Sequence, residues 1–122
     1  MKLITKEIVE TIPALYSQES RGDAARAVVK FFDPTGSWTW YASEGSFVCP
    51  EHGNYDCAEC PKPWRLDDFL FFGLVFGAEV EYGYFSLSEL QGWPGRMGLG
   101  IERDLYWKPQ TFAEIKQKVG VR

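Results

Sequence analysis

The chain has 122 residues, the size of one domain with a single hydrophobic core. Hydrophobic residues make up 45% of it, yet no apolar run approaches the roughly 18 residues of a membrane span, so we expect no membrane partner. A net charge of −4 argues against a general electrostatic grip on nucleic acid, although it leaves room for a local basic patch.

The N-terminal segment is predicted to be a short helix. Thr5 suits the N-cap, because its hydroxyl can accept a hydrogen bond from the first turn, and Pro13 ends the helix. Residues 1–16 lack the apolar core of a secretory signal, which favours a reducing, cytoplasmic location. The polar residues 17–23 are predicted to be a loop. The apolar residues at helical spacing are Leu3, Ile4, Ile8 and Ile12.

A first antiparallel hairpin is predicted from residues 27–32 and 38–42. Between them, Asp33-Pro34-Thr35-Gly36 has the residue types of a type I turn. Trp38 and Trp40 share one face of the second strand, because side chains alternate along a strand. We favour core packing for these tryptophans, and stacking on nucleic-acid bases is the alternative.

The segment 43–66 is predicted to be a zinc-bearing insertion between two strands. Its spacing is C-x2-H-x4-C-x2-C, and it contains all three cysteines and the only histidine of the chain. Thiolate and imidazole ligands in a closed tetrahedron are typical of structural zinc, and four protein ligands leave no open position for catalysis. The predicted ligands are Cys49, His52, Cys57 and Cys60.

Free thiols, iron, a disulfide and a redox Cys-x-x-Cys motif are the alternatives to zinc. Three cysteines cannot all form disulfides. A redox motif normally opens a helix, which Pro61 and Pro63 disfavour. The window from Cys49 to Cys60 contains almost no aliphatic residue, so we expect its order to depend on bound metal.

A second hairpin is predicted from the apolar residues 68–76, a central strand covered on both faces, and residues 80–85. Ser86 and Glu89 then form the capping box of a short helical turn. The glycine-rich residues 91–100 are interpreted as a crossover loop. A phosphate-binding loop requires a strand before it and a helix after it, and neither is predicted here.

Near the C-terminus, residues 105–107 are predicted to be a short edge strand. The charged residues 102–104 are interpreted as salt-bridged surface rather than as an acid–base cluster. Thr111 and Glu114 form a second capping box, which begins a C-terminal helix. The apolar stripe of that helix is Phe112, Ile115 and Val119.

The sum is an α+β domain over residues 1–122 with a zinc-binding insertion at 43–66. Its sheet is mostly antiparallel with about four or five strands, helices lie at both chain ends, and the zinc-bearing loop lies between two hairpins.

Five residues are candidate contacts for a partner. Three follow the last metal ligand, where an aromatic side chain between basic ones suits a single nucleic-acid strand, although we favour Trp64 sealing the loop onto the domain. The other two suit a protein contact if they are exposed. The five are Lys62, Trp64, Arg65, Trp93 and Met97.

Five motifs outside the Cys/His segment together suggest a family. They are Lys30-Phe31-Phe32, Trp38-Thr39-Trp40-Tyr41, Asp68-Phe69-Leu70-Phe71-Phe72-Gly73-Leu74-Val75, Gly83-Tyr84-Phe85-Ser86-Leu87-Ser88-Glu89-Leu90 and Glu102-Arg103-Asp104-Leu105-Tyr106-Trp107-Lys108-Pro109. With them the chain resembles domain of unknown function 2958, a family of small bacterial proteins often encoded on plasmids, integrated elements and phages. The resemblance implies no catalytic residue, because the family has no established activity. Shorter members join the two strands by a brief acidic stretch, which implies that the Cys/His segment is a variant feature.

We expect a small zinc-stabilised binding module with a protein partner, such as an adaptor or an anti-defence-type inhibitor of a mobile element. The first alternative is an accessory protein that binds single-stranded nucleic acid through Trp64, its basic neighbours and sheet aromatics. An uncharacterised enzyme is the second. We do not favour it, because the single histidine is assigned to the metal and no hydroxyl–base pair stands out.

Overall fold

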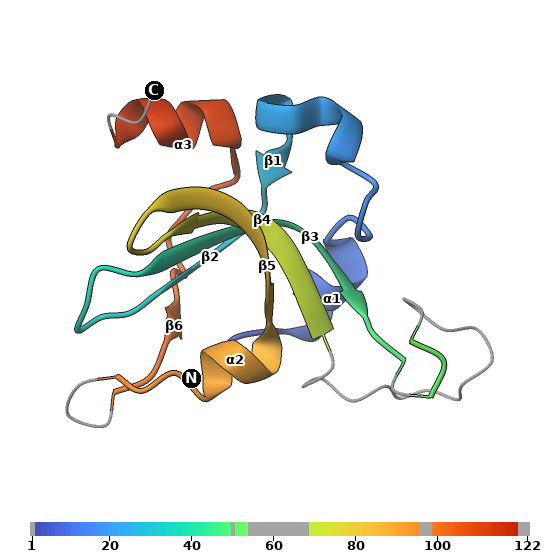
Figure 1. The fold of residues 1–122 in the computed structure, drawn as a ribbon, viewed down its shortest axis with the longest axis horizontal. Helices are drawn as coiled ribbons and strands as arrows, with labels where there is room; N and C mark the ends of the chain where they lie inside the picture. The colour runs from blue at the N-terminus through green and yellow to red at the C-terminus, as the bar shows by residue number, and fades with distance from the viewer. Residues whose placement is uncertain (1, 50, 54–68, 96–98, 120–122) are drawn as a thin grey trace.

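A computed structural model describes residues 2–49, 51–53, 69–95 and 99–119. It confirms a mixed α+β fold with antiparallel sheets (Figure 1). The strands are β1 (Arg26–Ala27), β2 (Val29–Phe32), β3 (Thr39–Phe47), β4 (Phe69–Phe76), β5 (Val80–Ser86), β6 (Glu102–Arg103) and β7 (Gln110–Thr111). The helices are α1 (Lys6–Thr11), α2 (Leu87–Gln91), α3 (Phe112–Lys118) and the 3-10 helix η1 (Glu19–Ala24). The large sheet has the order β5-β4-β3-β2-β6, and β1 pairs with β7 in a second, two-stranded sheet.

The three α-helices begin where the sequence predicts their caps. The hydroxyls of Thr5, Ser86 and Thr111 accept hydrogen bonds from the amide three residues later, at 3.2, 3.1 and 3.2 Å. At Thr111 the carboxylate of Glu114 also accepts from the backbone amide, which completes the capping box. These bonds satisfy amides that a helix leaves without an internal partner, so each helix has a defined start.

The first hairpin forms as predicted, with one break. The amide of Gly36 donates to the carbonyl of Asp33 at 3.3 Å, as in a type I turn, and β2 pairs with β3. The strand predicted at 27–32 is split, however, because Ala27 pairs with Gln110 of β7 rather than with β3. The loop predicted at 17–23 overlaps the 3-10 helix η1.

Strand β3 is longer than predicted, so the predicted start of the insertion, at residue 43, lies inside this strand. The strand continues to Phe47, which pairs with Phe69 at the start of β4. The register shifts between Ala42 and Glu44, as in a β-bulge. The described part of the predicted insertion is therefore mainly sheet, and residues 54–66 lie outside the described residues.

Buried polar side chains explain this longer strand. The carboxylate of Glu44, which is 2% exposed, accepts the amides of Tyr16 and Gln18 at 2.7 and 2.8 Å. The buried hydroxyl of Ser46 accepts the amide of Leu15 at 3.0 Å. Because the segment before η1 satisfies these groups, a polar stretch can continue a buried strand.

The edge strand predicted at 105–107 is wrong. The strand that pairs with β2 is Glu102–Arg103, and Tyr106 is 92% exposed. The carboxylate of Asp104 accepts the amide of Tyr106 at 3.0 Å and lies 3.4 Å from the ammonium of Lys30. Aspartate bonded to the amide two residues later forms an Asx turn, which directs the chain away from the sheet.

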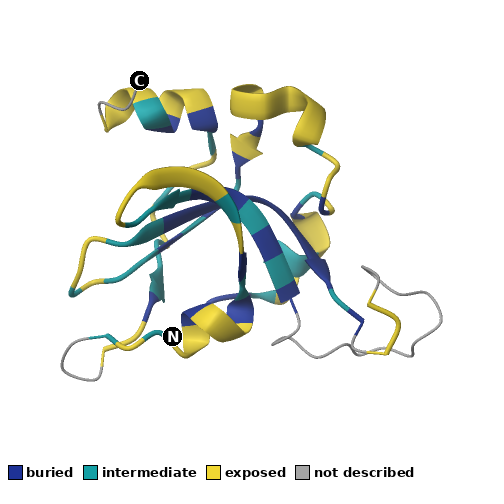
Figure 2. Ribbon diagram, viewed as in Figure 1, coloured by how far each residue is buried: buried dark blue, intermediate teal, exposed yellow. Residues whose placement is uncertain are grey.

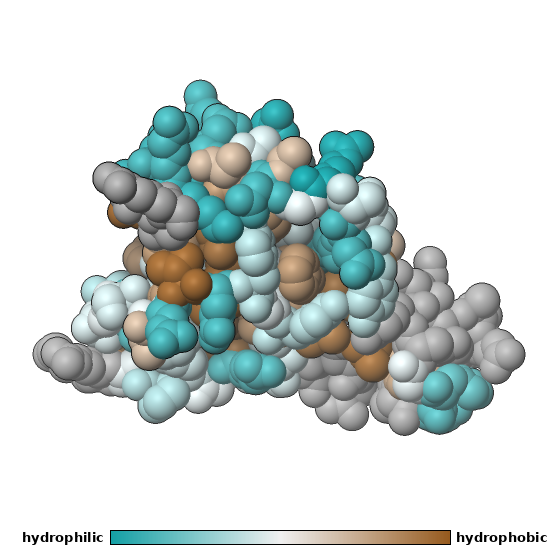
Figure 3. Space-filling view, turned by 45° about the horizontal axis from the view of Figure 1, so that its top comes forward, coloured by the Kyte–Doolittle hydropathy of each residue, from teal (hydrophilic) through white to brown (hydrophobic). Residues whose placement is uncertain are grey.

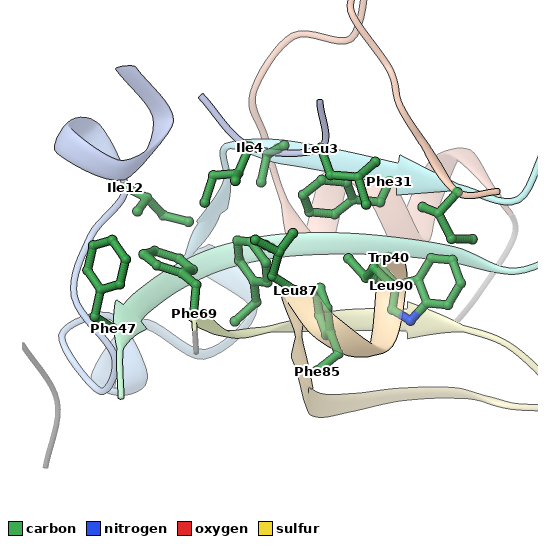
Figure 4. Packing of buried hydrophobic residues seen from close by; sticks show 14 residues of the cluster. Leu3, Ile4, Ile12, Phe31, Trp40, Phe47, Phe69, Phe85, Leu87 and Leu90 are labelled. Carbon is green, nitrogen blue, oxygen red and sulfur yellow. The ribbon is translucent and has the colours of Figure 1, made fainter. Parts of the chain in front are cut away.

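Buried apolar residues form two clusters, one on each face of the large sheet. Figure 2 shows buried positions along the central strands of this sheet. The N-terminal segment and α2 cover one face, and Trp40 lies there with 3% exposure, which confirms core packing for this tryptophan. Figure 4 shows Ile12, Phe47 and Phe69 at one end of this cluster. The smaller cluster on the other face includes α3 and is formed by Ala25, Ala27, Tyr41, Leu74, Phe112 and Ile115.

In helix α3, Phe112 and Ile115 of the predicted apolar stripe are buried. The third residue of the stripe, Val119, is 49% exposed. Within the described residues, no helix is both long enough and apolar enough to cross a membrane.

Candidate functional site

The structure places two of the four predicted metal ligands next to each other. Cys49 follows the end of β3 and is buried, whereas His52 is exposed. Nδ1 of His52 lies 3.4 Å from Sγ of Cys49, and the His52 amide donates to the same sulfur at 3.4 Å. The amide of Gly53 donates to the Cys49 carbonyl at 2.8 Å, with a φ of 70° that glycine adopts without strain.

This spacing fits two ligands of one zinc ion. Sulfur and nitrogen bind zinc at about 2.3 and 2.0 Å, so at a tetrahedral angle the two atoms are about 3.5 Å apart. Within the described part of the chain, no three His, Cys, Asp or Glu side chains are grouped to hold a metal. The predicted ligands Cys57 and Cys60 lie outside the described residues, as do Lys62, Trp64 and Arg65.

Four aromatic side chains on β4, β5 and the loop before η1 form a second feature, which we call the aromatic surface: Tyr16, Phe72, Tyr82 and Tyr84. Tyr84 is 50% exposed and lies opposite Phe72 in the sheet. The centre of its ring is 5.1 Å from that of Phe72 and 6.2 Å from that of Tyr16. Figure 2 shows that β5 is exposed over most of its length. Figure 3 shows one face of the molecule, on which hydrophobic side chains lie between hydrophilic ones.

Tyr16 reaches this surface through an unusual backbone conformation. Its φ of 70° lies in the left-handed region, which costs a non-glycine residue about 1 kcal/mol. The hydrogen bonds from Tyr16 and Gln18 to the buried carboxylate of Glu44 stabilise this conformation. Glu44 therefore fixes the backbone of the loop that carries Tyr16.

A small cavity adjoins the aromatic surface. It has a volume of about 100 Å³, which suits one side chain of a partner. Its wall is mostly apolar, and the carboxylate of Glu44 within it is bound to backbone amides. The lining residues are Gln18, Glu19, Gly22, Ala25, Ser43, Glu44, Phe72, Tyr82 and Phe112.

An ionic cluster joins η1, β5 and α3 beside the surface. The hydroxyl of Tyr82 donates to Asp23, and Nζ of Lys116 lies 3.1 and 3.2 Å from the Asp23 oxygens and 4.6 Å from the Tyr82 ring centre. The hydrogen bonds from Tyr82 and Lys116 lower the pKa of Asp23. Burial and the bond to Asp23 raise the pKa of Tyr82. The bonds of Asp23 thus hold η1, β5 and α3 together, and we call this group the Asp23 clamp.

Trp93, which suits a protein contact only if it is exposed, packs against the tryptophans of the first hairpin. This tryptophan is half-buried, and its ring centre lies 5.2 Å from that of Trp38 and 5.0 Å from that of Trp40. Its indole N–H donates to Asp33 at 3.1 Å, so the crossover loop folds back onto the first hairpin. The other candidate in this loop, Met97, lies outside the described residues.

A larger open cavity, of about 550 Å³, shows no catalytic arrangement among its described lining residues. The described lining residues include no serine, cysteine, tyrosine or histidine, so they form no hydroxyl–base or thiol–base pair. The lining residues are Lys2, Leu3, Ile4, Leu90, Gln91, Leu99, Gly100, Ile101 and Glu102.

The fold and these sites define a small α+β domain with an exposed aromatic surface and a Cys/His turn. Residues 64–119 match the family described as "Protein of unknown function (DUF2958)". The resemblance inferred from the sequence is confirmed there. The match includes Phe72, Tyr82 and Tyr84, whereas all four predicted metal ligands precede it. No curated protein and no solved structure matches the chain.

Proposed function

We propose that the protein is a small binding module that docks a protein partner on the aromatic surface. In this proposal, a structural zinc ion bound by Cys49, His52, Cys57 and Cys60 orders the segment between β3 and β4. The family carries no assigned activity, so the proposal depends on the site alone.

The observation that carries the proposal is the exposure of Tyr84 on strand β5. A tyrosine that is 50% exposed and packed on Phe72 presents a large ring of restricted mobility, with a hydroxyl that can still hydrogen bond. Tyrosine is enriched at protein interfaces and at their energetic centres. The adjoining cavity of about 100 Å³ supplies a recess for one anchoring side chain of the partner.

The charges beside the aromatic surface favour a protein over a nucleic acid. Proteins that bind single strands combine aromatic rings with a cationic groove. Here Glu19 lies at the cavity and Asp23 beside Tyr82, while the ammonium of Lys116 is engaged by Asp23. A partner with basic side chains around an apolar anchor therefore fits this surface best.

The distance of 3.4 Å between the donor atoms of Cys49 and His52 supports the zinc part of the proposal. These residues, together with Cys57 and Cys60, supply three thiolates and one imidazole, a set that suits structural zinc. The anti-defence inhibitor role depends on the family resemblance only, and no described residue distinguishes an inhibitor from an adaptor.

Site-specific photocrosslinking in the native host tests the docking surface. The photoreactive residue p-benzoylphenylalanine replaces Tyr84 in one variant and Tyr106 in the control, which is also exposed but lies outside the aromatic surface. We expect one protein other than a second copy of this chain to be crosslinked from position 84 and not from position 106. Nucleic acid crosslinked from position 84 instead, or equal protein capture from both positions, would contradict the proposal.

A further inference from the structure

Strand β5 is an unpaired edge of the large sheet. All seven of its residues pair with β4 on one side. Within the described residues, no backbone hydrogen bond joins β5 to any other segment. In Figure 1 no strand runs along its outer side, which agrees with its terminal place in the strand order. Its outward amides and carbonyls are therefore available to another strand.

This edge lacks the features that usually prevent pairing between molecules. Edge strands are commonly short, bulged, or interrupted by proline or lysine. Strand β5 has seven residues, its pairing with β4 shows no register shift, and Glu81 is its only charged residue. At the opposite edge, β6 has two residues. The sheet therefore has one long edge that can accept a strand.

Gly83, at the centre of β5, is not required by the fold of one chain. A Cβ atom added there would meet nothing within 4 Å, and the backbone of this glycine is not in the left-handed region. A glycine inside a strand often marks a place where another backbone approaches closely. The centre of the open edge is thus the place where a second strand fits best.

Strand β5 can pair with a second copy of itself about this glycine without placing like charges opposite each other. We propose that β5 pairs antiparallel with β5 of a second copy, about a two-fold axis at Gly83, so that two five-stranded sheets become one. An axis at Glu81 would place two carboxylates opposite each other, which is unfavourable. An axis at Gly83 avoids this contact and pairs all seven residues of the strand. The resulting pairs are Gly83 with Gly83, Tyr82 with Tyr84, Glu81 with Phe85, and Val80 with Ser86.

The symmetry of this dimer has a consequence for the aromatic surface. A two-fold axis perpendicular to the sheet keeps Tyr82 and Tyr84 of both copies on the same side of the joined sheet. Seven pairs extend over about 24 Å, which gives an interface at the small end of the range for stable dimers. We therefore expect dimers that dissociate on dilution. The pairing does not depend on the proposed partner.

Sedimentation of the full chain across a concentration series tests the proposal, with Gly83→Lys as the disrupting variant. Two ammonium groups opposite each other at the axis disfavour the dimer, and lysine is a natural protector of edge strands. We expect the dimer dissociation constant to rise at least about tenfold, which corresponds to 1.4 kcal/mol. The control is Gly100→Lys, because Gly100 also has nothing within 4 Å of an added Cβ and lies outside β5.

A Gly83→Cys variant tests the position of the axis independently, and it decides the question if the lysine variant does not fold. Paired residues of antiparallel strands have Cα atoms about 4.5 to 5.5 Å apart, within the range that a disulfide spans. We expect oxidation to link the two introduced thiols, identified by peptide mapping, and not those of Gly100→Cys. A chain that is monomeric at every concentration, or a dimer that Gly83→Lys leaves unchanged, overturns the proposal.

Discussion

At the scale of single residues, Glu44 connects the N-terminal segment to the sheet. Its carboxylate is buried and accepts the amides of Tyr16 and Gln18. These bonds hold Tyr16 in the left-handed conformation that brings its ring against Tyr84. One acidic side chain thus connects β3 to the loop that carries Tyr16 of the aromatic surface.

We expect Glu44→Gln to destabilise the protein by about 1–3 kcal/mol, because the amide nitrogen that replaces one oxygen faces a backbone donor. Urea unfolding measures this loss, with Glu19→Gln as the control, since Glu19 is exposed. Equal stabilities of the two variants would show that the carboxylate is not needed at this position.

The clamp at Asp23 predicts a pH dependence. Because hydrogen bonds from Tyr82 and Lys116 lower the pKa of Asp23 in the folded state, its contribution to stability is complete above the unfolded pKa of about 3.9 and is lost as the pH falls through the lower folded value. The side chain is 52% exposed, so we expect an effect below about 1 kcal/mol.

Urea midpoints of the wild type and Asp23→Asn between about pH 6 and pH 2 measure this contribution. We expect the wild type to be more stable at pH 6 and the difference to vanish at the acid end. A difference that is constant over this range contradicts a role for the Asp23 charge.

For the metal site, we expect the purified wild type to contain one zinc per chain and Cys49→Ser to contain much less, because a hydroxyl is a poor zinc ligand. Elemental analysis measures the content, and Glu51→Gln is the control from the same turn. Wild-type protein without stoichiometric metal, or full zinc content in Cys49→Ser, refutes the assignment of this ligand.

At the scale of elements, the sequence predicts features that depend on neighbouring residues, but not those that depend on contacts far along the chain. The caps at Thr5, Ser86 and Thr111 use atoms within three residues, so the sequence alone predicts them. The end of β3 depends on contacts such as Glu44 with Tyr16, 28 residues away, which no local pattern contains. The turn at Asp104 likewise involves its distant partner Lys30.

The candidate site likewise combines features that the local sequence predicts with features that depend on distant contacts. The sequence places Tyr82 and Tyr84 on one face of their strand by alternation, and it gives the spacing of Cys49 and His52. It does not reveal that Tyr84 stays exposed, because that depends on where η1 and α3 cover the sheet. It also gives no sign that Trp93 folds back onto the hairpin.

Two glycines that face each other across β4 and β5 give a test at this scale. A Cβ added at Gly73 would lie 1.7 Å from the carbonyl oxygen of Tyr41, whereas one added at Gly83 would meet nothing within 4 Å. We expect Gly73→Ala to destabilise the protein by about 1–3 kcal/mol or more. Gly83→Ala should be neutral or stabilising by up to about 1 kcal/mol.

Urea unfolding of both variants decides this prediction, because the two positions differ mainly in the space around the added methyl group. Similar losses at both glycines would contradict the close approach of β3 to β4 at Gly73.

At the scale of the whole molecule, the two faces of the sheet differ in how completely they are covered. The larger cluster, which contains Phe31 and Phe71, fills one face and is closed by the N-terminal segment and α2. On the other face, α3 and η1 leave Tyr84 exposed beside a small cavity. Both faces thus carry part of the core, and in the proposed function the uncovered part of the second face is the surface that binds the partner.

The most direct test of this account is the affinity of the crosslinked partner for purified Tyr84→Ser and Tyr106→Ser, measured by calorimetry beside the wild type. If the aromatic surface is the docking site, Tyr84→Ser weakens binding at least about tenfold, as expected for an interfacial tyrosine, and Tyr106→Ser leaves it unchanged. Unchanged affinity in Tyr84→Ser, or equal losses in the two variants, contradicts the account.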